Sequence, residues 1–384
     1  MNIMDFGKYA KAAMRSISYT SCKKYYDKLY TSMLLDLDIN PNEKVEGEDE
    51  WIKNWDGLKI VPNPIYYRLF RHYCGNKKGI CPEDICRQVI EPCLNPQRYR
   101  GFYEDKNSWD AIHADSPFPP TTVRCIDGLF YDKDYKRIVG VDDKKFYAIL
   151  SEAGGGKFFV KPTRDSNSSR GTSSINFDNG KWYLGKERNH DLTINDIIAL
   201  SGRNFIIQPF QKQHAEMSKF CSTSINPLRI ITYKSVTDDK VHVMRGAMIR
   251  IGAQGEENDG THGNGKYVGI NQDGTLKHDV LDYLGHVTHE FNGIDFRNDY
   301  TIPGWDKACK VVTHIAEQVI HHRLLAFDVM IDEKGEPIVF EYNINSFSIW
   351  LPQFVGELSF DEYTDEVIEY CKKNVDIVKR QFLY

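Results

Sequence analysis

The 384-residue sequence has no block of Lys or Arg and no apolar run near the ~20 residues that cross a bilayer. Its 49 Lys and Arg against 54 Asp and Glu give a formal net charge of −5. Without a basic patch to release counterions, nucleic acid is a poor partner. The first residues carry charged side chains where a secretory signal needs a continuous apolar stretch. We therefore predict a cytoplasmic protein with no membrane span and no nucleic-acid partner.

The nine cysteines lack the short C-x2-C pairs that are typical of structural zinc sites. Four of them follow the spacing C-x6-C-x4-C-x6-C, namely Cys74, Cys81, Cys86 and Cys93. An odd number of cysteines without an export signal argues against a disulfide framework. We interpret the four as small buried hydrophobic residues, with a metal site as the less favoured alternative.

The pattern of the sequence changes near residue 120. Residues 1–100 combine helical spacing of apolar residues with turn-rich connections, which predicts a helical accessory region. Beyond residue 120, short apolar runs alternate with turns and with helix candidates at 142–152, 193–202 and 305–323. This pattern predicts an α+β fold with largely antiparallel strand pairs. At roughly 150 residues per domain the chain holds two or three units, which we place at 1–100, 101–207 and 208–384.

The most informative segment runs from residue 324 to residue 345. Two strand-like runs flank a turn, and a reversal centred between Lys334 and Gly335 places Asp328 directly opposite Glu341. Asn343 shares their face, because side chains alternate along a strand. The opposite face is predicted to be an apolar core surface made of Leu325, Phe327, Val329, Ile331, Ile338, Phe340, Tyr342 and Ile344.

Two opposed carboxylates with Cβ atoms about 5 Å apart repel each other. They need a proton, solvent or a cation between them. Mg²⁺ binds one or two carboxylates together with substrate phosphates, and an amide oxygen from Asn343 adds a ligand. We therefore predict a metal site at Asp328, Glu341 and Asn343. The alternative is a solvated hairpin face on which two acids happen to oppose.

A candidate phosphate site follows a strand that ends in Lys161-Pro162. The preceding Gly154–Lys157 run is not a P-loop, since its glycines precede a strand and Phe158 replaces the Ser or Thr that would reach Mg²⁺. Residues 163–174, TRDSNSSRGTSS, are dense in donors that suit polyphosphate. The alternative is a solvated connection. The candidate contacts in this loop are Ser168, Ser169, Gly171 and Thr172.

Further along the chain, a buried strand ends at Gln208, Pro209 and Phe210. A connection of this kind between lobes can read an adenine edge with its backbone. Arg229 and Arg250 then lie on successive strand candidates, and a guanidinium suits phosphate or carboxylate. For each arginine taken singly, a surface charge pair is the alternative.

In this order, the features resemble the ATP-grasp superfamily and, within it, the sugar-transfer-associated ATP-grasp family. The resemblance spans residues 105 to 343. It rests on Asp105-Lys106-Asn107, Phe159-Val160-Lys161-Pro162, Ile207-Gln208-Pro209, Ser224-Ile-Asn226-Pro-Leu-Arg229, Ile249-Arg250-Ile-Gly252, Asn258-Asp259, Phe327-Asp328 and Glu341-Tyr-Asn343.

The resemblance implies two α+β lobes that grip ATP, formed by residues 101–207 and 208–384. It implies that Lys106 and Lys161 contact the α and β phosphates, that the hinge holds adenine and that Glu216 reaches the ribose. Two Mg²⁺ ions would bind the hairpin, and Arg250 and Arg229 would be catalytic residues facing the γ-phosphate. The implied substrate contacts are Asn226, Asn258, His262 and Asn264.

The activity implied by the resemblance is that of an ADP-forming, ATP- and Mg²⁺-dependent carboxylate–amine ligase acting through an acyl phosphate. Its substrates would be small or sugar-linked carboxylates and amines, in polysaccharide or cell-surface sugar modification. Two alternatives stay open. One is a phosphotransferase acting on a sugar hydroxyl, and the other is a non-catalytic nucleotide-binding module that docks a glycosyltransferase through residues 1–100.

Overall fold

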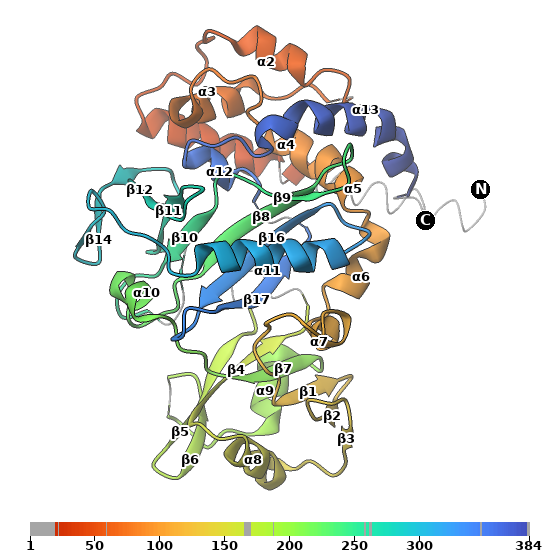
Figure 1. The fold of residues 1–384 in the computed structure, drawn as a ribbon, viewed down its shortest axis with the longest axis vertical. Helices are drawn as coiled ribbons and strands as arrows, with labels where there is room; N and C mark the ends of the chain where they lie inside the picture. Colours follow the sequence, from red (N-terminus) through yellow and green to blue (C-terminus); the bar gives the residue numbers. More distant parts are fainter. Residues whose placement is uncertain are drawn as a thin grey trace.

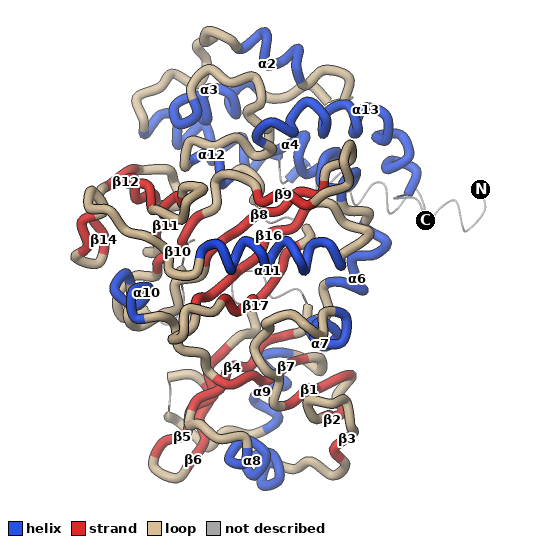
Figure 2. The backbone as a smooth tube through the Cα atoms, in the orientation of Figure 1, coloured by secondary structure: helices blue, strands red, loops and turns tan. Residues whose placement is uncertain are grey.

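The fold contains two large antiparallel sheets, which lie one above the other in the view of Figure 1. Helices cover the outer parts of these sheets. The computed structural model describes residues 20–381 apart from residues 22, 59, 165–169, 187, 257–258, 261–262 and 346–347. Figure 2 shows that many helices gather at one end, whereas the strands lie in the middle and at the other end together with further helices. Within the described part, no helix is both long enough and apolar enough to cross a bilayer.

The smaller lobe is built on a seven-stranded sheet with the order β3-β2-β1-β7-β4-β5-β6. Helices α8 (Asp143–Glu152) and α9 (Ile194–Ser201) pack against it around one apolar core. Thr193 and Asp196 form a capping box that starts α9. The strands are β1 (Val123–Ile126), β2 (Leu129–Tyr131), β3 (Arg137–Ile138), β4 (Lys157–Pro162), β5 (Ser173–Asp178), β6 (Lys181–Leu184) and β7 (Phe205–Pro209).

The larger lobe is built on an eight-stranded sheet with the order β13-β12-β11-β10-β8-β16-β17, with β9 also paired to β8. Helix α11 (Trp305–Gln318) covers one face of this sheet (Figure 1). The strands are β8 (Leu228–Lys234), β9 (Val241–Val243), β10 (Met248–Ile251), β11 (Lys266–Ile270), β12 (Leu276–Leu281), β13 (Val287–Thr288), β16 (Leu324–Ile331) and β17 (Pro337–Asn343). A short helix α10 (Ala215–Phe220) and the small β14 (Glu290–Phe291) and β15 (Ile294–Asp295) pair lie beside it.

The other face of the larger sheet is covered by the N-terminal helices together with the C-terminal ones. These elements share one core with strand residues such as Ile231, Met248 and Ala326. The cysteines at 74, 81, 86 and 93 are all buried here, as interpreted from the sequence. The helical elements are residues 23–36, α2 (Glu48–Asn54), α3 (Pro64–Cys74), α4 (Glu83–Ile85), a π-helical turn (Cys86–Ile90), α5 (Glu91–Leu94), α12 (Leu351–Phe354) and α13 (Thr364–Gln381).

Short helical turns connect this N-terminal region to the smaller lobe. They are a 3₁₀ turn (Gln97–Tyr99), α6 (Arg100–Tyr103), a second 3₁₀ turn (Lys106–Ser108) and α7 (Trp109–Ile112). Figure 1 shows α7 beside the junction of the two sheets. The connection therefore brings the segment around residue 106 to the space between the lobes.

The predicted α+β fold with antiparallel pairs is confirmed, since every strand pair among the described residues is antiparallel. The helix candidate at 305–323 is too long. Helix α11 ends at Gln318, because Val319 leaves helical geometry (φ −86°, ψ 72°) and is buried in the core as the chain turns into β16. The unit boundaries at residues 100 and 207 stay predictions.

Asn95 joins the N-terminal region to the larger sheet. Its side-chain nitrogen donates to the carbonyl oxygens of Leu324 (2.6 Å) and Ile344 (2.8 Å). Its side-chain oxygen accepts the backbone N–H groups of Arg323 and Leu324, both at 3.0 Å. Leu324 begins β16 and Ile344 follows β17. One buried side chain therefore hydrogen-bonds to both strands at the end of the pair that lies opposite the turn.

The variant Asn95→Ala should be strongly destabilised. The substitution leaves the polar backbone groups around Leu324 and Ile344 buried without partners, and each such group costs about 1–3 kcal/mol. We expect the free energy of unfolding to fall by about 3 kcal/mol or more, measured as a lower urea midpoint.

Asn54→Ala is the matched control. Its amide makes one exposed bond, 3.1 Å to the carbonyl oxygen of Lys78, so the change should stay within about 0.5 kcal/mol. Equal urea midpoints for the two variants would contradict the role given to Asn95.

Candidate functional site

The candidate site begins at the β16–β17 hairpin, where Asp328 pairs directly with Glu341 as predicted. The predicted pairing holds from Ala326–Asn343 to Asp328–Glu341. The predicted core residues on β16 are buried, and so are Tyr342 and Ile344. Asp328 and Glu341 therefore lie on the face of the sheet that α11 does not cover.

The hairpin differs from the prediction near its turn. Beyond Asp328 the register shifts, so that Val329 pairs with Val339 and Phe340 is left as an extra residue. This β-bulge reverses which side chains of β17 point inward, and Val339 is fully buried in place of Ile338 and Phe340. The assignment of Ile338 and Phe340 to the core face was therefore wrong.

Two lysines approach the hairpin from the side of the smaller lobe. The Lys106 ammonium lies 3.3 Å from Glu341 Oε1, and its side chain is almost fully buried. The Lys161 ammonium donates to the carbonyl oxygen of Phe340 at 3.3 Å. The backbone N–H of Lys106 donates to the carbonyl oxygen of Thr163 at 3.0 Å, just after β4. The lysine-bearing segments are thus joined to each other, and both contact β17.

The pKa of Lys161 is lowered to about 8, and burial is the largest cause. The neighbouring charge on Lys106 lowers the pKa further, and Glu341 and Asp328 offset part of the shift. A buried ammonium group has lost its hydration, so a second cation nearby makes protonation still less favourable. An anion placed between the two lysines would relieve this cost.

Two arginines lie on the neighbouring strands of the larger sheet. Arg229 on β8 pairs directly with Asp328 in the sheet register. Its guanidinium donates Nε to Asp328 Oδ1 at 2.8 Å and Nη2 to Asp328 Oδ2 at 3.2 Å. Arg250 on β10 places Nη1 3.5 Å from Asp328 Oδ1 and forms hydrogen bonds with Asp259. Arg229 thus holds Asp328 directly, and Arg250 lies near the same carboxylate.

The charges of the site sum to a small positive value. Lys106, Lys161 and the two arginines carry four positive charges, and Asp259, Asp328 and Glu341 carry three negative ones, so 4 − 3 leaves +1. Such a set favours a polyanion over a free cation. Positively charged side chains in a partly buried cleft are the usual basis of phosphate binding.

The hairpin residues fit Mg²⁺ in combination with phosphate. Asn343 donates its side-chain N–H to the carbonyl oxygen of Ala326 at 3.4 Å, which leaves an oxygen donor on the same side chain. Within the described ranges, no three His, Cys, Asp or Glu side chains cluster as a complete metal site. Mg²⁺ keeps to one or two carboxylates and takes its other ligands from water and phosphate, so two carboxylates and an amide suffice.

The predicted hinge lies where β7 leaves the smaller sheet. Gln208 is buried and donates its side-chain N–H to the carbonyl oxygen of Pro119 at 2.8 Å. The backbone N–H of Phe210 donates to the carbonyl oxygen of Lys157 at 3.0 Å. Glu216, the predicted ribose contact, is exposed on α10 and pairs with Lys219 at 2.6 Å. The Gln208 side chain and the Phe210 N–H group thus both form hydrogen bonds within the protein.

Among the predicted loop residues, Gly171 begins the return from the loop to β5 with φ +72°. A Cβ at this position would lie 2.8 Å from Pro162 Cγ and 3.1 Å from the carbonyl oxygen of Leu200, so only glycine fits. Thr172 follows it and is half-buried. Ser168, Ser169, Asn258 and His262 lie outside the described residues.

Of the predicted substrate contacts, two are described. Asn226 is fully buried, and its side-chain N–H groups face the carbonyl oxygens of Met217 (2.9 Å) and Cys221 (3.0 Å). Asn264 is exposed in the loop before β11. Asn226 therefore holds the segment between α10 and β8.

Two features of the site were not predicted from the sequence. One is the contact of Asp259 with Arg250, which depends on the path of a loop. The other is the Phe340 carbonyl, which faces Lys161 only because of the β-bulge. The glycines around Asp259 were the single signal that could have indicated a tight turn at this place.

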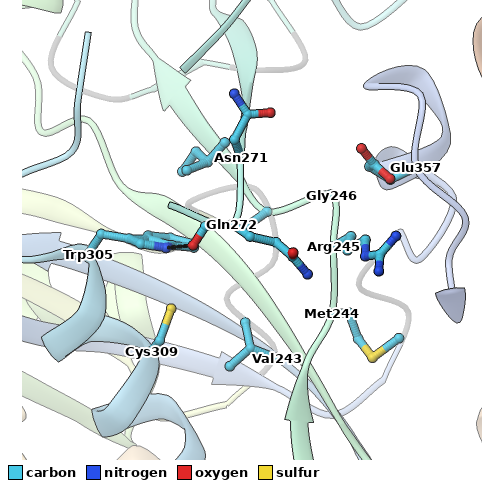
Figure 3. Close-up of a pocket in the computed structure, with 11 residues that line it drawn as sticks. Val243, Met244, Arg245, Gly246, Asn271, Gln272, Trp305, Cys309 and Glu357 are labelled. Carbon is cyan, nitrogen blue, oxygen red and sulfur yellow. Dashed lines mark hydrogen bonds between the residues drawn. The ribbon is translucent and has the colours of Figure 1, made fainter. Parts of the chain in front are cut away.

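A cavity of about 480 Å³ lies elsewhere in the larger lobe. Figure 3 shows Trp305 and Cys309 of α11 on one side and Arg245 and Glu357 on the other. None of the described site residues lines it. This cavity is therefore separate from the Asp328 cluster.

Two lobes with antiparallel sheets, a carboxylate hairpin on the larger lobe, and two lysines beside it from β4 and the segment around residue 106 are the features expected of an ATP-grasp protein. The family model described as sugar-transfer associated ATP-grasp matches residues 88–368, which is 281 of the 384 residues. The chain belongs to this family. ATP-grasp proteins are mostly ADP-forming ligases. No curated protein sequence matches the chain.

Solved structures give distant matches. The D-alanine-D-alanine ligase from Coxiella burnetii is 8% identical with a TM-score of 0.39, over 72% of this chain and 59% of that one. The biotin carboxylase from Campylobacter jejuni, solved with a β,γ-ATP ligand, is 9% identical with a TM-score of 0.40, over 71% and 46%. The D-alanyl-alanine synthetase A from Vibrio cholerae is 14% identical with a TM-score of 0.35, over 74% and 65%. The chain thus spans less than two thirds of each of these proteins.

The low pKa of Lys161 predicts a specific pH dependence of stability. Below pH 8 the Lys161 side chain is protonated in both the folded and the unfolded protein. Between pH 8 and the ordinary lysine pKa of 10.5 the unfolded chain binds more protons, so the free energy of unfolding rises with pH. Relative to Lys161→Met, the wild type should gain up to about 1.4 kcal/mol per pH unit in this range.

Urea unfolding at pH 7.5 and pH 9.5 measures this difference. Titrating groups that do not interact with Lys161 are common to both proteins and cancel. Parallel pH profiles for the wild type and Lys161→Met would show that Lys161 is not desolvated as described.

Proposed function

We propose that the protein is an ATP- and Mg²⁺-dependent carboxylate–amine ligase that forms ADP and an acyl phosphate. The observation that carries the proposal is the convergence of lysines from one lobe and arginines from the other on the Asp328–Glu341 pair. Together with the acid pair, these groups come from five separate strands and the segment around residue 106. A structural ion pair needs two partners, whereas a triphosphate with bound metal needs this whole set.

Lys106 and Lys161 would hold the α and β phosphates. Their spacing around β17 and the unfavourable proximity of their charges support this assignment. The loop with Ser168, Ser169, Gly171 and Thr172 would add hydroxyl and backbone donors. Gln208, Pro209 and Phe210 would line the adenine, and Glu216 would reach the ribose. Because Phe210 already donates its N–H to Lys157, adenine would be read by other groups of the hinge.

Asp328, Glu341 and Asn343 would hold Mg²⁺, two ions in the proposed complex. Bound Mg²⁺ would neutralise phosphate charge and polarise the γ-phosphoryl group. For Asp328 to bind metal, Arg229 has to give up part of its two-point contact. Arg229 would then donate in part to a phosphate or acyl phosphate oxygen. The contact of Arg229 with Asp328 supports the proposed catalytic role of Arg229, because it places the guanidinium beside the proposed metal ligand.

The proposed reaction needs no covalent nucleophile on the protein. A substrate carboxylate attacks the γ-phosphorus, the bond to the β-phosphate oxygen breaks, and ADP leaves. An amine then attacks the acyl carbon, and inorganic phosphate leaves as the amide forms. Both steps move negative charge, and Arg250 and Arg229 would stabilise it from fixed positions on the sheet. Removal of one such donor typically costs about 10²–10³ in rate.

The family name is the support for a role in polysaccharide or cell-surface sugar modification. We propose sugar-linked or small carboxylates and amines as substrates, a cytoplasmic site of action where ATP is available, and a glycosyltransferase as partner. Asn264 and, in the undescribed loop, Asn258 and His262 stay as proposed substrate contacts.

Incubation with ATP, Mg²⁺ and hydroxylamine across a panel of carboxylates tests the proposal. Hydroxamate formed together with ADP is the expected result, because hydroxylamine traps an acyl phosphate. A phosphorylated sugar in place of hydroxamate would indicate a phosphotransferase. ATP binding without hydrolysis under any condition would indicate a non-catalytic module, and either outcome would overturn the ligase.

The variant Glu341→Gln should lose the Mg²⁺ dependence of ATP affinity. It removes one of two carboxylate ligands and the partner of Lys106, while its size is unchanged. We expect ATP turnover to fall by at least about 100-fold. Calorimetric titration of ATP with and without Mg²⁺ measures the change.

Glu336→Gln is the matched control, since Glu336 lies in the turn of the same hairpin, is exposed and pairs with Lys307. This variant should behave as the wild type. Full turnover by Glu341→Gln would rule out the metal assignment.

A further inference from the structure

Arg250 divides its guanidinium between two carboxylates. Its Nε donates to Asp259 Oδ2 at 2.5 Å, and its Nη2 donates to the same oxygen. Its Nη1 lies 3.5 Å from Asp328 Oδ1, which is beyond a good hydrogen bond. Two of the three nitrogens are thus committed to Asp259, and the third faces Asp328 without closing on it.

Asp328 already has a full guanidinium partner in Arg229. A second guanidinium in full contact would occupy lone pairs that a cation needs, because a carboxylate has about four acceptor positions in all. Arg250 is well placed to make that contact, since β10 and β16 flank β8 on its two sides. The hydrogen bonds of Arg250 to Asp259 explain why Arg250 Nη1 stays 3.5 Å from Asp328 Oδ1.

A tight turn between β10 and β11 holds Asp259 in this position. The carbonyl oxygen of Gly260 accepts the N–H groups of Gly263 (2.7 Å) and Gly265 (3.0 Å). A Cβ on Gly265 would lie 1.9 Å from the carbonyl oxygen of Asp259. Glycine at 265 is thus required for the chain to return past Asp259. The side chains of Asp259 and Arg250 are 15% and 18% exposed, so solvent screens their pair only partly.

We propose that Asp259 is a positioning residue that keeps Arg250 away from Asp328. Asp328 then stays available for a divalent cation, and Arg250 Nη1 points to the space beside it, where phosphoryl oxygens would lie. The proposal rests on the proposed function, because it takes Asp328 as a metal ligand. Acids and arginines alternate in the series Asp259, Arg250, Asp328 and Arg229. By holding Arg250, Asp259 leaves the negative charge of Asp328 available to a cation.

Loss of Asp259 should make Arg250 a competitor of the metal. Without its partner, Arg250 needs to move by less than an ångström to hydrogen-bond Asp328. The variant Asp259→Ala should therefore need more Mg²⁺ for ATP binding, by about tenfold, which corresponds to the loss of about one charge-assisted hydrogen bond. The defect should disappear when Arg250 is also removed, since the competitor is then absent.

The experiment is a double-variant cycle on binding. The Mg²⁺ concentration that gives half of the maximal ATP affinity is measured by calorimetry for the wild type, Asp259→Ala, Arg250→Ala and the double variant. The double variant should require the same Mg²⁺ concentration as Arg250→Ala, within about threefold. Asp299→Ala is the control, because Asp299 is 96% exposed, and it should match the wild type.

Unchanged Mg²⁺ dependence in Asp259→Ala would overturn the proposal, and so would a double variant whose defect is the sum of the two single defects. If Asp259→Ala does not fold, Asp259→Asn gives the same test with the side-chain volume retained, and a shift in the same direction is expected. A wild type without Mg²⁺-dependent ATP binding would instead contradict the proposed function, so the two failures are separable.

Discussion

The opposition of Asp328 and Glu341 across one strand pair is the constraint on which the site depends. Two carboxylates cannot face each other on adjacent strands without compensation, since their charges repel at this distance. In the described structure the compensation is a two-point contact from Arg229 to Asp328 and an ammonium from Lys106 beside Glu341. The cations come from elements that are far apart in the sequence. Because these cations offset the repulsion, the charge balance of the hairpin depends on side chains from both lobes.

The scaffold behind this hairpin includes the N-terminal region. Side chains two and four residues from Arg229 and Asp328, such as Ile231 and Leu324, point to the same face of the sheet and are buried under the N-terminal and C-terminal helices. The charged cluster and the helical cap therefore share one sheet face. From within that cap, the Asn95 side chain hydrogen-bonds to Leu324 at the start of β16 and to Ile344 just after β17.

Much of the fold could be read from local patterns. Alternating apolar residues and turn signals predicted β4, β7, β8, β16 and β17, and the pairing of Asp328 with Glu341 followed from the position of Gly335, which has φ +78°. The β-bulge at Phe340 could not be read, because its apolar side chain suits either face of β17. The burial of Asn226 was also missed, since an Asn in a loop gives no sign of whether its amide faces a ligand or the backbone.

By itself, the sequence determined the class of fold, the hairpin that bears the two acids, and Lys161 and the two arginines as candidates, because each of these depends on spacing within a short segment. Lys106 was indicated only by the resemblance to the family. The tertiary structure alone decided which cation meets which acid. Lys106 and Glu341 are 235 positions apart, and Arg229 and Asp328 are 99 apart. Contacts over such separations depend on how two sheets and a loop are packed. No local pattern in the sequence shows which of these distant residues come into contact.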